Sequence, residues 1–268
     1  MILASHGIIA SQILSTDPDW LAYYNRVVTA GGSLSTTEQN ATKTLVADLK
    51  SAGIWSAMKA IYPMVGASAA ACAQNLKSAS FTGTFTSGWT FASTGATPNG
   101  SSAYMDTGFI PTSNGLAYNE NHISLYSRTN ISGATYDIGS AGNILSTQLY
   151  TLFLRRTGDN AAYDTGAFPT NRAAFTNTNS QGFYLGNSNS TNAQYWKNGI
   201  SQITITPSSS SISNVSAYVG GMNEANVNKF YSTREVAFAS FGLSLTNTQA
   251  SNFYTAVQAF QTTLSRNV

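Results

Sequence analysis

The sequence predicts a mainly-β protein: an antiparallel β-sandwich with a small N-terminal helical region and a C-terminal amphipathic helix. Three observations lead to this fold class. Residues 234 to 245 alternate so that both faces are apolar, as in a strand buried inside a sandwich. A helix start signal follows at once at Thr246. From about residue 76, short β-branched and aromatic runs are separated by Gly, Asn, Ser and Pro.

Length and composition set the scale of the fold. The 268 residues can bury a substantial core, and one main domain is expected. We divide the chain into an extended N-terminal anchoring segment (1–16), a helical lead-in (17–66) and the sandwich (76–268). Charged residues are 9% of the chain, against roughly 25% in typical domains, while aromatics are 12%. A packed fold with a polar, nearly uncharged surface follows.

Two capped helices are predicted near the N-terminus. Asp17, followed by Pro at the first helical position, begins the first helix, and a Gly pair ends it at residue 31. Ser35 and Glu38 form a capping box for the second helix, whose natural stop is Gly53. The apolar spacing of residues after that stop predicts a short third helix, which continues to residue 62 until a proline blocks it.

The sandwich is predicted from a series of short strands. In chain order they are 84–91, 103–109, 123–129, 136–139, 150–156, 182–186, 195–197, 200–206, 217–220 and 234–245. Asn198-Gly199 is the strongest hairpin signal, because a type I′ turn needs positive φ at both central residues. Thr246 and Gln249 form a second capping box, and an apolar stripe from Ala250 to Leu264 predicts the final helix.

Several of these motifs together resemble a known family. They are residues 98–109, the hairpin in which Asn198-Gly199 follows Tyr195-Trp196-Lys197, the segment Tyr218-Val219-Gly220-Gly221, the 237–242 strand and the capped final helix. Their order resembles the concanavalin A-like, laminin-G-like jelly roll. Residues 17–19, 47–55 and 58–66 look like the helical lead-in of tailed-bacteriophage virion proteins that carry such a domain. The similarity covers nearly the whole chain.

The resemblance implies a virion protein without enzymatic activity. It suggests a structural or accessory component on the particle surface: a head fibre, a decoration protein or a tail fibre component, with a contribution to host-surface attachment. The implied partners are capsid or tail proteins, and the implied state is a homo-oligomer, a trimer if the protein is fibre-like. These motifs belong to the scaffold, so they bear on fold and context more than on a binding activity.

Charge and hydropathy exclude two classes of partner. The net charge is +2 and the 13 basic residues are scattered, so no basic patch predicts nucleic-acid binding. No segment is long and apolar enough to span a membrane, and residues 1–16 lack the basic leader of a signal peptide. Cys72 is the single cysteine, which excludes an intrachain disulfide, and we expect it in the core.

The acidic residues do not predict hydrolysis. Relatives of this fold that are glycoside hydrolases carry alternating acids on one strand, and that pattern is absent here. Asp159 and Asp164 lie in a Gly- and Asn-containing region, so we interpret them as turn formers. Asp106 is alone on its strand. A glycoside hydrolase with an unrecognised site remains an alternative.

Histidines and cysteine predict neither a nucleophile nor a metal centre. His6 and His122 lie far apart and no nucleophile elbow accompanies them, so His122 is interpreted as structural. One cysteine and two separated histidines do not form a zinc-binding pattern. No cofactor is expected. A weak Ca²⁺ site built from Asn and backbone carbonyls stays an open alternative.

Aromatic side chains are the remaining candidates for binding. Trp196, Tyr195 and Tyr184 are candidate glycan-binding residues, because sugars are bound by flat rings beside amide and hydroxyl groups. The competing interpretation places Trp196 in the sandwich core or in a subunit contact, since large aromatics are mostly buried. A lectin-like adhesin is therefore the alternative function.

Overall fold

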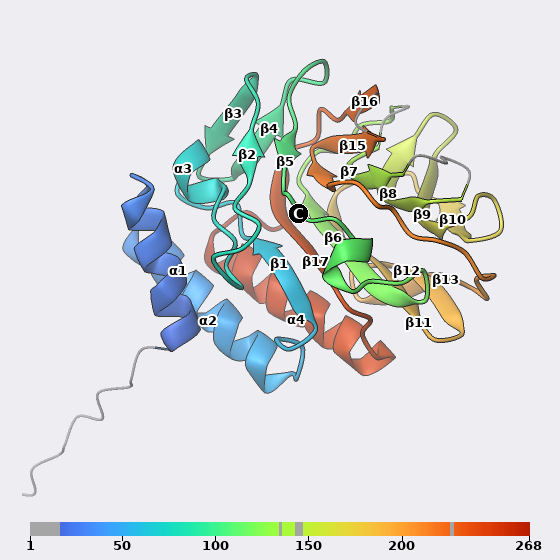
Figure 1. Cartoon of the computed structure of the whole chain (residues 1–268). Helices are drawn as coiled ribbons and strands as arrows, with labels where there is room; N and C mark the ends of the chain where they lie inside the picture. The colour runs from blue at the N-terminus through green and yellow to red at the C-terminus, as the bar shows by residue number, and fades with distance from the viewer. Residues whose placement is uncertain (1–16, 134–135, 143–146, 226–227) are drawn as a thin grey trace, which may run out of the picture.

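The computed structural model describes residues 17–133, 136–142, 147–225 and 228–268. Two β-sheets pack face to face and three long helices cover the outer face of one of them (Figure 1). The predicted mainly-β sandwich with its C-terminal helix is confirmed. The predicted anchoring segment, residues 1–16, and His6 within it lie outside the described residues.

Sheet A has the strand order β13-β12-β11-β6-β17-β4-β3 over the described residues, and β1 also pairs with β17. Its strands are β1 (Met58–Tyr62), β3 (Trp89–Ala92), β4 (Gly95–Pro98), β6 (Glu120–Ser127), β11 (Gly182–Asn189), β12 (Asn192–Lys197), β13 (Ile200–Ile205) and β17 (Val236–Gly242). The predicted 234–245 strand is β17, which lies inside the sheet between β6 and β4. All seven of its residues are buried, as its two apolar faces predict.

Sheet B has the order β10-β9-β8-β7-β14-β5-β2 over the same residues. Its strands are β2 (Thr84–Phe85), β5 (Met105–Asp106), β7 (Ile138–Ala141), β8 (Leu149–Arg156), β9 (Asn160–Gly166), β10 (Arg172–Thr176), β14 (Tyr218–Val219), β15 (Gly221–Glu224) and β16 (Asn228–Tyr231). The β15–β16 hairpin branches from the sheet, with β15 parallel to β7. Strands β9 and β10 are not among the predicted strands.

Helices α1 (Pro18–Thr29), α2 (Thr36–Ser51) and α4 (Asn247–Thr263) lie together on the sheet A side of the sandwich (Figure 1). All three predicted caps are present: Asp17 on α1, and capping boxes on α2 and α4. One core lies between the helices and sheet A, and a second core lies between the two sheets. The short helices are α3 (Ala69–Cys72) and a 3₁₀ turn at Thr112–Asn114. No helix among the described residues is long and apolar enough to cross a membrane.

The predicted third helix, residues 54 to 62, is wrong. Its second half is strand β1, which pairs antiparallel with β17, Ile61 opposite Ser240 and Tyr62 opposite Ala239. A short apolar run fits a helix or a buried strand equally well, and pairing with a distant strand decides between them. The helical lead-in therefore contributes a strand to sheet A.

The Asn198-Gly199 hairpin is confirmed. Both residues have positive φ, 48° and 76°, and they join β12 to β13 as the type I′ turn requires. The hairpin tip reaches the C-terminal helix, where the Ser251 hydroxyl donates to the Gly199 carbonyl at 3.1 Å. The turn thus connects the edge of sheet A to α4.

Candidate functional site

The three aromatic residues proposed from the sequence as glycan contacts are buried. Tyr184 and Tyr195 are 0% exposed, in the core between the sheets, and Trp196 is 7% exposed beneath the helices. The expectation of an exposed platform there is wrong, because strands β11 and β12 have sheet B on one face and helices on the other. The competing interpretation is correct that Trp196 is buried, but the residue lies in the core between sheet A and the helices and not in the core between the two sheets.

The outer face of sheet B carries no helix in Figure 1. The side chains of strands β8, β9 and β10 point alternately into the core and to this outer face. Tyr150, Leu152, Leu154, Tyr163 and Ala173 point into the core between the sheets. Thr151, Phe153, Asp164 and Arg172 therefore point the other way, because successive strand residues face opposite sides.

A cluster of aromatic and charged residues forms on this face. We call it the Arg172 cluster, and it consists of Tyr136, Phe153, Arg156, Asp164, Phe168 and Arg172. At its centre, Arg172 donates to both carboxylate oxygens of Asp164, with Nε–Oδ1 2.6 Å and Nη2–Oδ2 2.7 Å. The Thr151 hydroxyl donates to the same carboxylate at 3.1 Å. This two-pronged geometry holds the guanidinium in one orientation.

Burial and charge act together on this ion pair. The Asp164 side chain is 1% exposed and the Arg172 side chain 13%. Burial lowers the pKa of the Arg172 guanidinium, but the hydrogen bonds and charge of Asp164 outweigh it, so the pKa lies above its ordinary value. Arg172 therefore stays charged.

Aromatic rings surround the guanidinium. The Arg172 guanidinium carbon lies 4.4 Å from the Phe168 ring centroid and 5.1 Å from that of Phe153. Tyr136 meets Phe153 edge-on, with centroids 5.6 Å apart. Phe168 is 47% exposed, so the cluster presents an accessible ring to solvent.

The β15–β16 hairpin contributes rings to two places on this face. Phe230 meets Tyr136 of the Arg172 cluster, with centroids 5.5 Å apart. The next residue, Tyr231, lies on the other side of the hairpin, 6.4 Å from Tyr104, which stacks on Tyr218 at 4.2 Å. The outer face of sheet B thus holds a second group of rings, the tyrosine cluster of Tyr104, Tyr218 and Tyr231.

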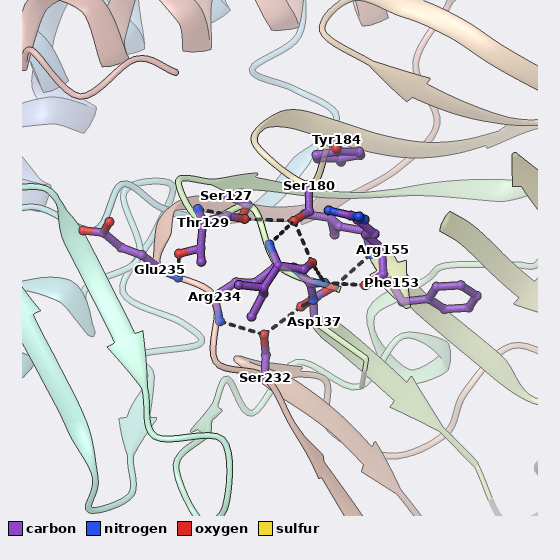
Figure 2. Close-up of polar contacts among 12 residues, drawn as sticks. Ser127, Thr129, Asp137, Phe153, Arg155, Ser180, Tyr184, Ser232, Arg234 and Glu235 are labelled. Carbon is purple, nitrogen blue, oxygen red and sulfur yellow. Dashed lines mark hydrogen bonds and ion pairs between the residues drawn. The ribbon is translucent and has the colours of Figure 1, made fainter. Parts of the chain in front are cut away.

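A buried ion pair fixes the strand that carries Phe153 (Figure 2). Arg234 Nη1 and Asp137 Oδ1 are 2.6 Å apart, and both side chains are 1% exposed. The backbone N–H of Leu154 donates to the other Asp137 oxygen at 2.8 Å, and Arg234 donates to the carbonyl of Arg155. The two contacts reach neighbouring residues of β8, Leu154 and Arg155, so the ion pair ties the segment just before β17 to the strand beside Phe153.

The positions of the acids differ in part from the sequence interpretation. Asp159 lies in a turn with φ of 54° and pairs with Arg155, as a turn former does. Asp164 lies in β9 and not in a turn, since it stands opposite Arg172 of β10 in the antiparallel pair, and its carboxylate forms an ion pair with that arginine. Asp137 and Asp164 are both held by arginines. Over the described residues no group of three His, Cys, Asp or Glu side chains is placed to hold a metal ion.

His122 and Cys72 have structural surroundings. His122 is fully buried, and its Nδ1–H donates to the Leu243 carbonyl at 2.5 Å. Burial lowers its pKa to about 4, so the ring is neutral near pH 7. Cys72 is buried in the core as predicted, and burial raises the pKa of its thiol to about 12.

A cleft of about 600 Å³ lies on the helical side, between the start of α2 and the end of α4. It is lined by Ser33, Leu34, Ser35, Thr37, Glu38, Gly66, Ala67, Ser93, Thr263, Leu264 and Ser265. Glu38 is already engaged by the α2 capping box and by the N–H of Gly66. The cleft offers hydroxyl groups but no aromatic ring, so we place the candidate site at the Arg172 cluster.

Comparison with known proteins adds evidence on the fold alone. No protein-family model matches the chain, and no curated protein matches it. Among solved structures, domain 4 of AbnA, a GH43 extracellular arabinanase from Geobacillus stearothermophilus solved with arabinotriose, matches with a TM-score of 0.53 at 12% identity. The match covers 74% of this chain and 98% of that domain. The β-sandwich fold is shared.

A second solved structure shares the fold over part of its length. The binding domain of botulinum neurotoxin serotype D matches with a TM-score of 0.51 at 9% identity, over 76% of this chain. This chain spans 52% of that structure.

Sequence reasoning missed the residues of the Arg172 cluster. The adjacent pair Arg155-Arg156 was visible, and so was the alternation along β8 that turns Phe153 away from Leu152. The pairing of Asp164 with Arg172 was hidden by the weak strand signal of β9 and β10, which are rich in alanine.

Proposed function

We propose that this protein is a carbohydrate-binding module without catalytic activity, whose ligand lies against the outer face of sheet B. The observation that carries the proposal is the exposed Phe168 ring backed by an arginine that Asp164 holds in place. A flat apolar ring beside fixed polar groups is the arrangement that fits a sugar, which presents an apolar ring face and a rim of hydroxyls. The shared fold with an arabinanase domain solved with arabinotriose supports the same class of ligand.

Binding is favoured over hydrolysis by the state of the carboxylates. A glycosidase needs two carboxyl groups across one groove, one of them a proton donor. Asp137 and Asp164 are each clamped by an arginine and almost fully buried. Both carboxylates are therefore occupied by arginine partners and are not open to the oxygen of a glycosidic bond.

The test is a glycan array with neutral, carboxylated and sulfated glycans, followed by calorimetry with arabinotriose and with the strongest hits. We expect Phe168→Ala to weaken binding about tenfold or more, since stacking and ring burial are lost. Leu21→Ala is the matched control, because Leu21 is 42% exposed on α1, away from sheet B. Absence of glycan binding by the wild-type protein contradicts the proposal, and so does equal binding by both variants and wild type.

We also propose that the module is displayed on a phage particle. The support is the resemblance of residues 17–66 to the lead-in of tailed-bacteriophage virion proteins, together with the 9% charged content, which suits a surface that must avoid salt-dependent adhesion. Capsid or tail proteins would be the partners, with a homo-oligomer, a trimer if fibre-like, as the assembled state. Mass spectrometry of purified particles and light scattering of the isolated protein test the two parts, and retention on particles after deletion of residues 1–16 contradicts docking through that segment.

A further inference from the structure

Arg156 has no partner for its charge within the described structure. Its guanidinium lies over Phe153, 4.4 Å from the ring centroid, and its side chain is partly exposed. All eleven Asp and Glu residues of the chain belong to the described part. None of them forms an ion pair with Arg156, and no other described residue accepts a hydrogen bond from it.

The two neighbouring arginines are fully engaged. Arg172 is held by Asp164 through two hydrogen bonds. Arg155 is held by Asp159 at 2.7 Å and donates to the Asn130 side chain at 2.8 Å. Three arginines and two carboxylates leave one positive charge on this part of the face. That charge is Arg156, which shares the Phe153 ring with Arg172.

We propose that the ligand of this face is an acidic sugar, whose carboxylate or sulfate group is bound by Arg156. This inference rests on the proposed carbohydrate-binding function. The planar guanidinium matches a carboxylate or sulfate with two parallel N–H donors, which a lysine cannot do. Phe153 supports the guanidinium from beneath, so less conformational freedom is lost when the anion arrives. Phe168 then stacks on the apolar ring face of the sugar, while Arg156 binds its charged group.

The experiment compares ligands that differ only in charge. Trigalacturonic acid and its fully methyl-esterified form are the pair that differs only in charge, since each carboxylate is replaced by a neutral ester. A chondroitin 4-sulfate tetrasaccharide, which carries sulfates as well as carboxylates, and inorganic sulfate, which carries no sugar, are measured beside them. Calorimetry is done on the wild type, Arg156→Gln and Lys43→Gln. Lys43 lies on α2 on the helical side, so its variant removes one positive charge away from the site.

We expect at least one acidic sugar to bind more tightly than the neutral ester, with an affinity that falls as salt rises. Arg156→Gln should weaken that binding about 10- to 100-fold, the usual cost of losing a charged hydrogen bond. Lys43→Gln should leave it unchanged. A thermal melt of each variant confirms folding.

The outcomes separate this inference from the function it rests on. If neutral sugars such as arabinotriose or the ester bind as well as the acids, or if Arg156→Gln binds acids normally, the acidic ligand is ruled out and the carbohydrate-binding function stands. If inorganic sulfate binds as tightly as the sulfated sugar, the site is a simple anion site and the inference is overturned. If no glycan binds at all, both proposals fall.

Discussion

Asp137 and Arg234 form an ion pair 2.6 Å long between two side chains that are each 1% exposed. Arg234 stands just before β17 and Asp137 just before β7, so the pair joins the two sheets at one end of the sandwich. Figure 2 shows polar groups from several segments gathered around it. Its position beside β8 links the stability of the fold to the placement of Phe153.

Replacing one partner of the Asp137–Arg234 pair should cost more stability than replacing both partners with apolar residues. We expect Arg234→Met to lower the free energy of unfolding by about 3–5 kcal/mol, because the Asp137 charge is left buried and unpaired. Adding Asp137→Leu should recover part of that loss. Urea unfolding of both single variants and the double variant measures the coupling. The partly exposed Arg155–Asp159 pair, expected to contribute about 1 kcal/mol or less, is the control. If the loss of unfolding free energy in the double variant equals the sum of the losses in the two single variants, Asp137 and Arg234 are not coupled.

His122 should make stability fall in acid. Its folded pKa is lowered from 6.5 to about 4, so the unfolded state binds the proton more readily between those values. Stability is therefore complete above pH 6.5 and declines as the pH falls toward 4, by about 3 kcal/mol from this residue. Denaturant unfolding from pH 7 to pH 4 measures the slope. His122→Gln should flatten it, and an identical slope in that variant would exclude His122 as the cause.

Gly199 should resist substitution for two reasons. Its φ is +76°, and an added Cβ would lie 2.6 Å from Cδ1 of Tyr254 on α4. We expect Gly199→Ala to cost about 1–3 kcal/mol, from backbone strain plus overpacking. Gly158→Ala is the matched control, since Gly158 also has positive φ, +84°, but nothing within 4 Å of a Cβ. Thermal denaturation should rank Gly199→Ala as the more damaging, and the reverse order would mean that the contact with Tyr254 has no effect.

Trp196 should matter for folding and not for ligand binding. Trp196→Ala should destabilise the protein by about 3–5 kcal/mol, because it opens a cavity beneath the helices. Trp196→Phe should cost much less, since the indole Nε1 has no hydrogen-bond partner among the described residues. Chemical denaturation gives the stabilities, and calorimetry with the bound glycan should give the wild-type affinity for Trp196→Phe. A lost affinity in that folded variant would return Trp196 to the list of contacts.

The parts of the fold that were predicted correctly are those that neighbouring residues determine. A capping box needs only Thr246 and Gln249, three positions apart, and a type I′ turn needs only Asn198 and Gly199. The apolar and small residues on both faces of the segment 236–242 likewise predict a strand with two buried faces. Features of this kind can be predicted from the sequence without knowing which other segments pack against them.

The sequence by itself therefore determined the sandwich class, the caps, the hairpin and the central strand. Tertiary structure alone decided that residues 58–62 form a strand, because β17 offers them a partner from the far end of the chain. It alone decided that Trp196 is covered by helices while Phe168 is exposed, and that Asp164 meets Arg172 across neighbouring strands. Burial and long-range ion pairs depend on which surfaces meet, and that information is spread over the whole chain.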